Sequence, residues 1–256
     1  MAYETITVEK EGNIGIITLN RPPTNAVNFA LLEDVEKALN QFEADKEVRA
    51  LIITGAGEKG FSAGFDITEA ARAAEIGDKG RAIYTRIERF PKPVVAAING
   101  YALGGGCELA MACHFRIMVN AEKAKIGCPE VNLGIIPGWG GTQRMPRLIG
   151  KTRALDMLVL GKRINAPEAL DIGLINKVSQ PGELMKDAKE LAGRLAKQAP
   201  IAVKCILDSV NRGLETTIDE GLKIEGKNLN EVSSTEDAIE GMTAFMQKRE
   251  PQFKGK

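Results

Sequence analysis

Three consecutive glycines, Gly104 to Gly106, separate a strand-like apolar run from a second apolar run that can form a helix. A turn built from glycine leaves its backbone N–H groups open to a ligand, because no side chains shield them. The N-terminus of the following helix adds partial positive charge at the same place. Glu108 would lie in the first turn of that helix. The stretch therefore predicts a site that stabilises a developing anion beside a carboxylate, as chemistry on a carbonyl group requires.

Strand-like and helix-like segments alternate along the first 150 residues, which predicts an α/β fold with a parallel sheet covered by helices. The apolar pattern predicts strands over residues 5–10, 14–19, 49–54, 93–98 and 115–119. It predicts helices over residues 29–42 and 67–89, the second with a break near residues 77–80.

Beyond residue 150 the chain becomes mainly helical. The predicted helices cover residues 151–160, 166–171, 183–197, 200–212, 216–230 and 234–248, and a last strand covers residues 174–178. The final helix has a long apolar face that includes Met242, Phe245 and Met246. We expect this face to pack on the chain's own core, and a neighbouring subunit is the alternative that the pattern leaves open.

The charge balance argues against partners that need a strong electrostatic field. The 34 Lys and Arg residues equal the 34 Asp and Glu residues, so no net field draws the chain to nucleic acid or to an anionic membrane. The longest apolar stretch, residues 94–113, contains glycines, Asn99 and Glu108 and is too broken to span a membrane. We therefore expect neither a nucleic-acid nor a membrane partner.

The residues that usually bind metals are scarce. The four cysteines show no C-x-x-C spacing and His114 is the only histidine, so we expect no metal site. His114 precedes a strand-like run and is expected to be a structural or surface residue. Unpaired cysteines are typical of a cytoplasmic protein.

Residues 55–60 read G-x-G-x-x-G directly after a predicted strand, which is the spacing of a dinucleotide-binding loop. In such a loop the third glycine opens a helix, whereas Gly60 is followed by Phe61-Ser-Ala-Gly64. The next strand also ends at Asn99, without an acid to bind a ribose. We therefore interpret the segment as a glycine loop at a strand end.

Two further segments carry polar groups that suit a site. Gly64 permits an unusual turn, so the N–H of Phe65 can point outward, and Asp66 can cap the helix that follows. Glu130 lies between Pro129 and apolar residues, which fits either a solvated loop acid or a tuned catalytic acid.

Together, the glycine turns predict a single site. In a parallel sheet the carboxyl ends of the strands share one edge, so the turns near residues 63–65 and 104–106 should meet. Two N–H donors from adjacent turns can form an oxyanion hole. Two nearby carboxylates can serve as acid and base.

Segments 55–67, 99–108 and 129–144 together resemble the crotonase (enoyl-CoA hydratase/isomerase) superfamily. The similarity runs essentially end to end, and the combination of motifs is highly specific. Shorter stretches at residues 20–22, 173–178 and 244–249 resemble its early loop, last core strand and C-terminal helix.

This resemblance implies a spiral of ββα units over residues 1–195 and a C-terminal helical oligomerisation region over residues 196–256. It implies trimers that often pair into hexamers, an acyl-CoA thioester as substrate and no metal or redox cofactor. Short-chain enoyl-CoA hydratases are the most similar members. They are lyases of fatty-acid β-oxidation that add water across the 2,3 double bond of a 2-enoyl-CoA to give a 3-hydroxyacyl-CoA.

By position, the resemblance assigns the oxyanion hole to the backbone N–H groups of Phe65 and Gly105. It assigns the acid/base pair to Glu108 and Glu130, with Glu130 exchanging a proton with the carbon next to the carbonyl and Glu108 holding the water. We expect a raised pKa on one of the two. Glutamate at both positions favours hydration. The implied substrate-binding residues are Ala26, Ala63, Asp66, Ile67, Gly138 and Trp139.

Other reactions occur on the same scaffold. Enoyl-CoA isomerisation and hydration of a cyclic dienoyl-CoA are the alternatives within enzymes, and an RNA-binding homologue is a distant one. RNA binding would need a lysine-rich helix, but acids interrupt the basic residues of segment 79–89.

Some positions depart from the family pattern. His114 stands where an acid is usual, and segment 118–124 is longer than usual, so we expect an altered path between the two glutamates. Phe65 replaces a commoner alanine, and Trp139 is bulky at the expected pocket edge. The two rings predict a pocket for a short or planar cyclic acyl group.

Overall fold

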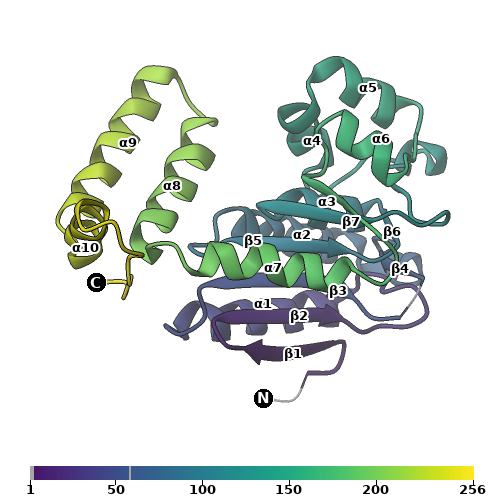
Figure 1. The fold of residues 1–256 in the computed structure, drawn as a ribbon. Coiled ribbons are helices and arrows are strands. Elements are labelled where there is room, and N and C mark those ends of the chain that lie inside the picture. Colours follow the sequence, from purple (N-terminus) through teal and green to yellow (C-terminus); the bar gives the residue numbers. More distant parts are fainter. Residues whose placement is uncertain (1–2, 58) are drawn as a thin grey trace.

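The computed structural model describes residues 3–57 and 59–256. Within them, the larger sheet has six strands in the order β1-β2-β3-β5-β7-β9 (Figure 1). β1 and β2 form an antiparallel hairpin, and the other neighbours are parallel. The strands are β1 (Ile6–Glu11), β2 (Ile14–Leu19), β3 (Ala50–Gly55), β5 (Val94–Ile98), β7 (Phe115–Val119) and β9 (Lys177–Ser179). The predicted parallel core is confirmed, and only the last strand lies more than one residue from its predicted place.

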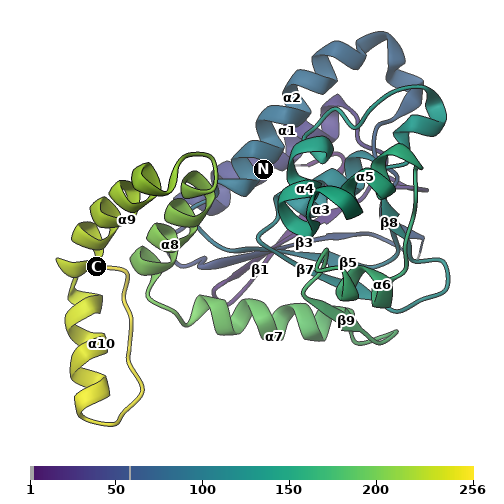
Figure 2. The ribbon, with the colours of Figure 1, turned by 90° about the horizontal axis from the view of Figure 1, so that it is seen from above.

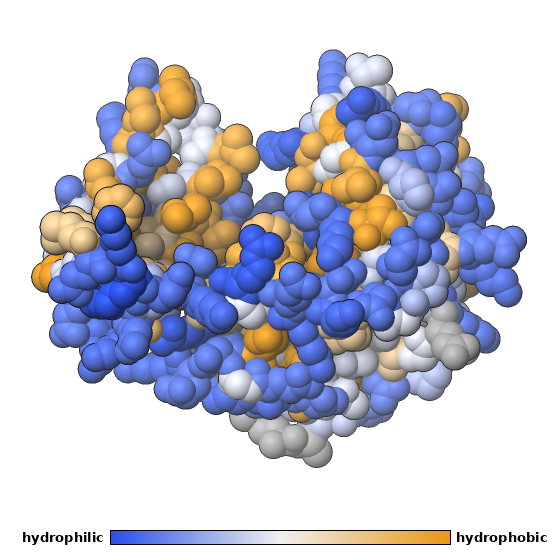
Figure 3. All heavy atoms as spheres, in the orientation of Figure 1, coloured by the Kyte–Doolittle hydropathy of each residue, from blue (hydrophilic) through white to orange (hydrophobic). Residues whose placement is uncertain are grey.

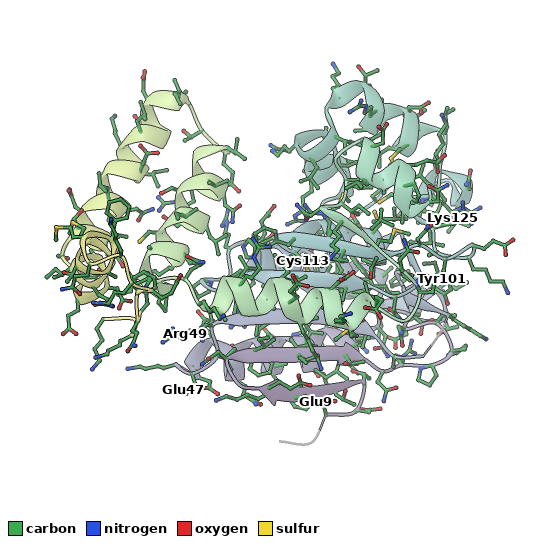
Figure 4. All side chains as sticks on the ribbon, viewed as in Figure 1. Glu9, Glu47, Arg49, Tyr101, Cys113 and Lys125 are labelled. Carbon is green, nitrogen blue, oxygen red and sulfur yellow. The ribbon has the colours of Figure 1, made fainter. Side chains whose placement is uncertain are left out.

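A smaller parallel sheet runs beside the first. Its strands are β4 (Gly60–Ser62), β6 (Tyr101–Leu103) and β8 (Ile126–Gly127). Each follows the end of a long strand, and a helical segment comes next, so the chain repeats a ββα unit. Figure 4 labels Tyr101 on β6 and Lys125 just before β8. These strands have two or three residues, which is too short for hydrophobic periodicity to predict.

The larger sheet lies between two helical layers, as Figure 2 shows. α7 (Leu184–Ala196) packs against one face, and α1 (Phe29–Ala44) packs against the other. α1 begins at Phe29 because the Asn28 side chain accepts a hydrogen bond from the N–H of Leu31. Its apolar positions recur at helical spacing and are buried, which fixes the face turned to the sheet. These residues are Leu31, Leu32, Val35, Ala38, Leu39 and Phe42.

The predicted break near residues 77–80 is wrong. α2 (Ala73–Glu88) runs through these glycines without interruption, and the break lies earlier, where the 3-10 helix η1 (Ile67–Arg72) meets α2. Gly80 has a packing reason instead, because a Cβ there would lie 2.9 Å from the ring of Trp139. Small residues here let an aromatic ring lie against the helix.

The other helices surround the site or form the C-terminal arm, which consists of α8, α9 and α10. They are α3 (Gly105–Ala112), η2 (Glu130–Leu133), α4 (Gly141–Ile149), α5 (Lys151–Val159), α6 (Ala166–Asp171), α8 (Pro200–Gly213), α9 (Ile218–Ser233) and α10 (Glu236–Met246). Figures 1 and 2 show α8, α9 and α10 extending away from the sheets.

The apolar face of the C-terminal arm is not covered by this chain's own core. Met242, Phe245 and Met246 are exposed, and Phe245 has 85% of its surface accessible. Figure 3 shows apolar atoms gathered over the arm and a hollow between the arm and the body. The expectation of packing within the chain is therefore wrong for these residues.

His114 is a structural residue, as expected. Its Nδ1 accepts a hydrogen bond of 3.0 Å from the N–H of Val94, so Nε2 carries the proton and lies 3.1 Å from the carbonyl of Glu88. Burial lowers the pKa of His114 to about 4. The imidazole is therefore neutral and joins α2 to β5.

This burial predicts loss of stability in acid. The unfolded chain takes up the His114 proton near pH 6.5 and the folded chain only near pH 4, so stability falls as the pH drops between these values. At pH 5 protonation of His114 should lower the free energy of unfolding by about 2 kcal/mol, and His114→Asn should not show this decrease. Urea unfolding at pH 7 and pH 5, at one protein concentration, measures the difference. Equal acid losses in both proteins would contradict it.

Candidate functional site

Two glycine turns meet at the end of the smaller sheet. Gly64 has a φ of +85°, and a Cβ there would lie 2.6 Å from both the nitrogen of Gly105 and the carbonyl oxygen of Leu103. Gly104 also has a positive φ, of 54°. Only residues without a side chain permit this approach. The expected meeting of the two turns is confirmed.

Each turn carries an N–H group that the fold leaves available. On either side of Phe65, the Gly64 carbonyl and the Asp66 N–H both bond to Val27. Among the described residues, no backbone acceptor is found for the N–H of Phe65 itself. Gly105 is the first residue of α3, where the N–H has no intrahelical acceptor. Two neighbouring donors are thus free to bind an oxyanion.

Glu108 is anchored by the backbone. It is buried in α3, and its Oε1 accepts hydrogen bonds of 2.7 Å from the N–H groups of Trp139 and Gly141. Burial raises the pKa of Glu108, while the two donors and the Arg144 cation oppose that shift. The carboxylate therefore has a fixed place at the start of α4.

Glu130 has a different environment. It opens η2, its Oε2 is buried, and no hydrogen-bond partner is found for that atom in the described part of the chain. A Cβ on Gly104 would lie 2.9 Å from its Oε1, so the carboxyl group rests against the glycine turn. Burial raises the pKa of Glu130 to about 7, and the charge of Glu108 contributes. β8, which pairs with β6, returns the chain to this turn after segment 118–124, so Glu130 lies beside Gly104.

Aromatic rings line the same turn. The Trp139 ring is 5.5 Å from Tyr84 and 6.2 Å from Phe65, both edge to face. A Cβ on Gly105 would lie 2.4 Å from the indole. The Tyr84 hydroxyl donates a 3.0 Å hydrogen bond to the Gly105 carbonyl. The turn is therefore held from behind by a packed, buried group.

The remaining expected substrate-binding residues lie at the rim. Asp66 pairs with Arg21 at 2.6 Å, and a hydrogen bond from the Thr68 hydroxyl lowers the pKa of Asp66. Arg21 also donates to the carbonyl of Ala26. Three others are exposed: Ala63, Ile67 and Gly138. Gly138 lies on the α4 side, apart from the cluster near Arg21.

Arg144 is a part of the site that the sequence did not reveal. Its guanidinium donates to both carboxylate oxygens of Glu88, at 3.0 and 2.8 Å, and to the Trp139 carbonyl at 2.7 Å. Its side chain is only 9% exposed. Its position just after glycines 138, 140 and 141 was the one sequence feature that pointed to it. The sequence alone does not predict that a single arginine is buried.

Three other expectations concern a dinucleotide-binding loop, a metal site and a membrane span. Gly55 ends strand β3 and Gly60 opens strand β4 and not a helix, so the described residues 56, 57 and 59 lie between two strands, and residue 58 lies outside the described ranges. Within residues 3–57 and 59–256, no cluster of three His, Cys, Asp or Glu side chains is placed to hold a metal ion. None of the described helices has the length and apolarity to cross a membrane.

Comparison with known proteins identifies the family. Residues 9–256 match the family model for enoyl-CoA hydratase/isomerase. The chain belongs to this family. It is 45% identical over 255 residues to the short-chain-enoyl-CoA hydratase of Clostridium acetobutylicum, with 97% of each chain covered. It is 46% identical to the crotonyl-CoA hydratase of Syntrophomonas wolfei, with 99% of each chain covered.

Solved structures of the family have the same fold. The crystal structure of an enoyl-CoA hydratase from Bacillus anthracis superposes with a TM-score of 0.95 at 40% identity, covering 99% of this chain and 100% of that one. An enoyl-CoA hydratase from Geobacillus kaustophilus gives a TM-score of 0.95 at 35% identity, covering 100% and 98%. The expected crotonase-like α/β fold is therefore confirmed.

The close packing of Gly105 against the indole can be tested by fluorescence, because Trp139 is the only tryptophan. Gly105→Ala should displace the buried ring and shift its emission to longer wavelength. Gly193→Ala is the matched control, since a Cβ there meets no atom within 4 Å. An unchanged emission maximum in Gly105→Ala would show that the ring does not rest on this turn.

Proposed function

We propose that this chain is an enoyl-CoA hydratase, which adds water across the 2,3 double bond of a short-chain 2-enoyl-CoA to give a 3-hydroxyacyl-CoA. The observation that carries the proposal is the pair of carboxyl groups, Glu108 and Glu130, beside a glycine turn with an unused N–H donor. The names of relatives that are 45% and 46% identical over nearly the whole chain support it. The reaction belongs to the lyases of fatty-acid metabolism.

The thioester oxygen binds the N–H groups of Phe65 and Gly105. As water adds to C3, negative charge develops on this oxygen, and the two donors stabilise the enolate-like state. Losing one such donor typically costs about 3–4 kcal/mol of barrier. The donors belong to rigid backbone, so little reorganisation is needed during the reaction.

The two glutamates divide the proton transfers because their surroundings differ. The two backbone donors favour the ionised form of Glu108, which takes a proton from the attacking water. Glu130, with its raised pKa, gives a proton to C2. The water oxygen thus bonds to C3, C2 gains hydrogen, and the pair still holds one proton. Dehydration follows the same path in reverse.

Binding of the acyl-CoA follows from the arrangement of the rim. The CoA part runs along residues 21–26 and 63–67, where Ala26, Ala63, Asp66 and Ile67 lie. The acyl part enters beside Phe65, Gly138 and Trp139, and the rings of Phe65 and Trp139 favour a short or planar chain. No redox cofactor or metal takes part in these steps.

The assembly proposed for the chain is a trimer, or a hexamer made of two trimers. The exposed apolar side chains of α8, α9 and α10 support this, since such patches mark interaction surfaces. Residues 196–256 then form the oligomerisation region and residues 1–195 the catalytic core. The chain's four free, buried cysteines suit the cytoplasm.

Hydration of crotonyl-CoA tests the function directly, through loss of the absorbance of the enoyl thioester. Glu108→Gln and Glu130→Gln should each lower kcat about 10²–10⁴-fold, because each removes one proton-transfer group. Turnover of a long-chain enoyl-CoA should be slower than that of crotonyl-CoA. Isomerisation of a 3-enoyl-CoA without hydration would refute the assignment, and full activity in either variant would refute that glutamate's role.

The raised pKa of Glu130 predicts the pH dependence. The hydrating form needs Glu130 protonated, so kcat/KM should decline as the pH rises through about 7, the pKa of this group. The acidic and basic limbs of the profile report two pKa values that describe the coupled pair of glutamates together. Initial rates with crotonyl-CoA between pH 5 and 9 measure it. A profile that stays flat up to pH 9 would contradict the role of Glu130 as proton donor.

A further inference from the structure

A continuous set of polar contacts links α2 to the candidate base. Glu88, at the end of α2, binds the Arg144 guanidinium with both carboxylate oxygens. Arg144 donates to the Trp139 carbonyl at 2.7 Å. The N–H groups of Trp139 and Gly141 then hold Oε1 of Glu108, each at 2.7 Å. Each link is a hydrogen bond, and the backbone N–H of Arg144 also donates to the Gly140 carbonyl of the same loop at 2.7 Å.

The loop that carries these donors is poorly fixed by its own sequence. Residues 138, 140 and 141 are glycines, and Gly140 has a φ of 113°. Such a loop has high conformational freedom, so its N–H groups need an outside support to stay in place. Arg144 supplies it from the first turns of α4, and a bidentate guanidinium–carboxylate pair gives it a fixed orientation.

The pair is also placed to act electrostatically. Arg144 is buried, and the partly exposed Glu88 lies beside it at the edge of a cavity of about 660 Å³ between the core and α8. Figure 4 labels Cys113, which lines the same cavity at the end of α3. In such a setting a charge acts on its neighbours more strongly than at an exposed surface.

We propose that Arg144 and Glu88 act together as positioning residues for hydration: Arg144 fixes the 139–141 loop that holds Glu108, and Glu88 orients Arg144 and offsets part of the field of its positive charge. This rests on the proposed hydratase function. Neither residue touches the reacting atoms, so both act through Glu108.

The charged and titratable groups around Glu108 come from several elements. Arg144 of α4 favours its ionised form. Glu130 of η2 and the neutral groups Tyr84 of α2 and Cys128, before η2, also interact with its charge. Arg144 is the cation among these groups, so changes in its charge should move the acidic limb of the pH profile in a known direction.

The test compares opposite changes in one pair. In Arg144→Met the loss of positive charge should move the acidic limb of kcat/KM for crotonyl-CoA to higher pH by about 0.5–1 unit. In Glu88→Gln the arginine keeps its charge without a counter-ion, so the limb should move to lower pH. Arg144→Lys keeps the charge but loses the forked contact, so kcat should fall roughly 10- to 100-fold with KM little changed.

The control uses a similar pair on the same helix. Arg86 of α2 pairs with Glu43 at 2.7 Å and, in the part of the chain that the structure describes, makes no hydrogen bond or ion pair with residues 139–141, so Arg86→Met should leave the profile unchanged. A second readout does not depend on turnover. The emission of Trp139 should titrate with Glu108, and its acidic midpoint should move in the same directions.

The outcomes separate the two proposals. Opposite shifts in Arg144→Met and Glu88→Gln, absent in Arg86→Met, support the positioning role. Unmoved limbs and midpoints in folded variants overturn it, even if the wild type hydrates crotonyl-CoA. If the wild type shows no hydration, the proposed function fails, and the fluorescence midpoints still decide the effect of the pair on Glu108. If Arg144→Met does not fold, Glu88→Gln alone decides by the direction of its shift.

Discussion

The approach of two backbone turns, at Gly64 and at Gly105, is the constraint on which the site depends. A Cβ at Gly64 would come within 2.6 Å of the Gly105 nitrogen, so any other residue would force the turns apart. The turns are brought together by the parallel pairing of β4 and β6. The larger sheet positions those short strands, because each follows one of its long strands. The spiral fold therefore brings the turn that carries the Phe65 N–H against the turn that carries the Gly105 N–H.

The two carboxyl groups of the site are both buried, but their hydrogen-bond partners differ. Glu108 and Glu130 both leave water, which raises the pKa of each. Glu108 recovers part of the lost hydration from two backbone donors at a helix start, whereas Glu130 has an oxygen with no partner found among the described residues. Hydrogen bonds to the charged form favour ionisation, so the two donors favour the ionised form of Glu108, and the buried Oε2 of Glu130 lacks this support.

Much of the fold follows from the sequence, because buried strands and amphipathic helices have distinct periods. The strands of the larger sheet before residue 150 were predictable to within one residue, and the glycine motifs indicated the edge where the site lies. The smaller sheet was not predictable, since its two- or three-residue strands show no period. The apolar face of α10 was correctly seen, but a pattern does not say what covers it. Arg144 was missed for a similar reason, because its importance comes from partners that are distant in sequence.

The predicted helix break at residues 77–80 shows how a local rule can mislead and still mark something important. Glycines usually weaken a helix, yet α2 runs through Gly77 and Gly80. With Tyr84 and Glu88 these glycines recur every three or four residues, so they share one face of the helix. That face accepts the Trp139 ring, bonds the Gly105 carbonyl and holds Arg144. One stripe on a single helix thus supports the Gly105 turn, the Trp139 ring and the loop that binds Glu108. Glycine at position 80 lowers the helix propensity of α2, but the missing side chain leaves space for the indole of Trp139. The packed indole then gives the site rigid support.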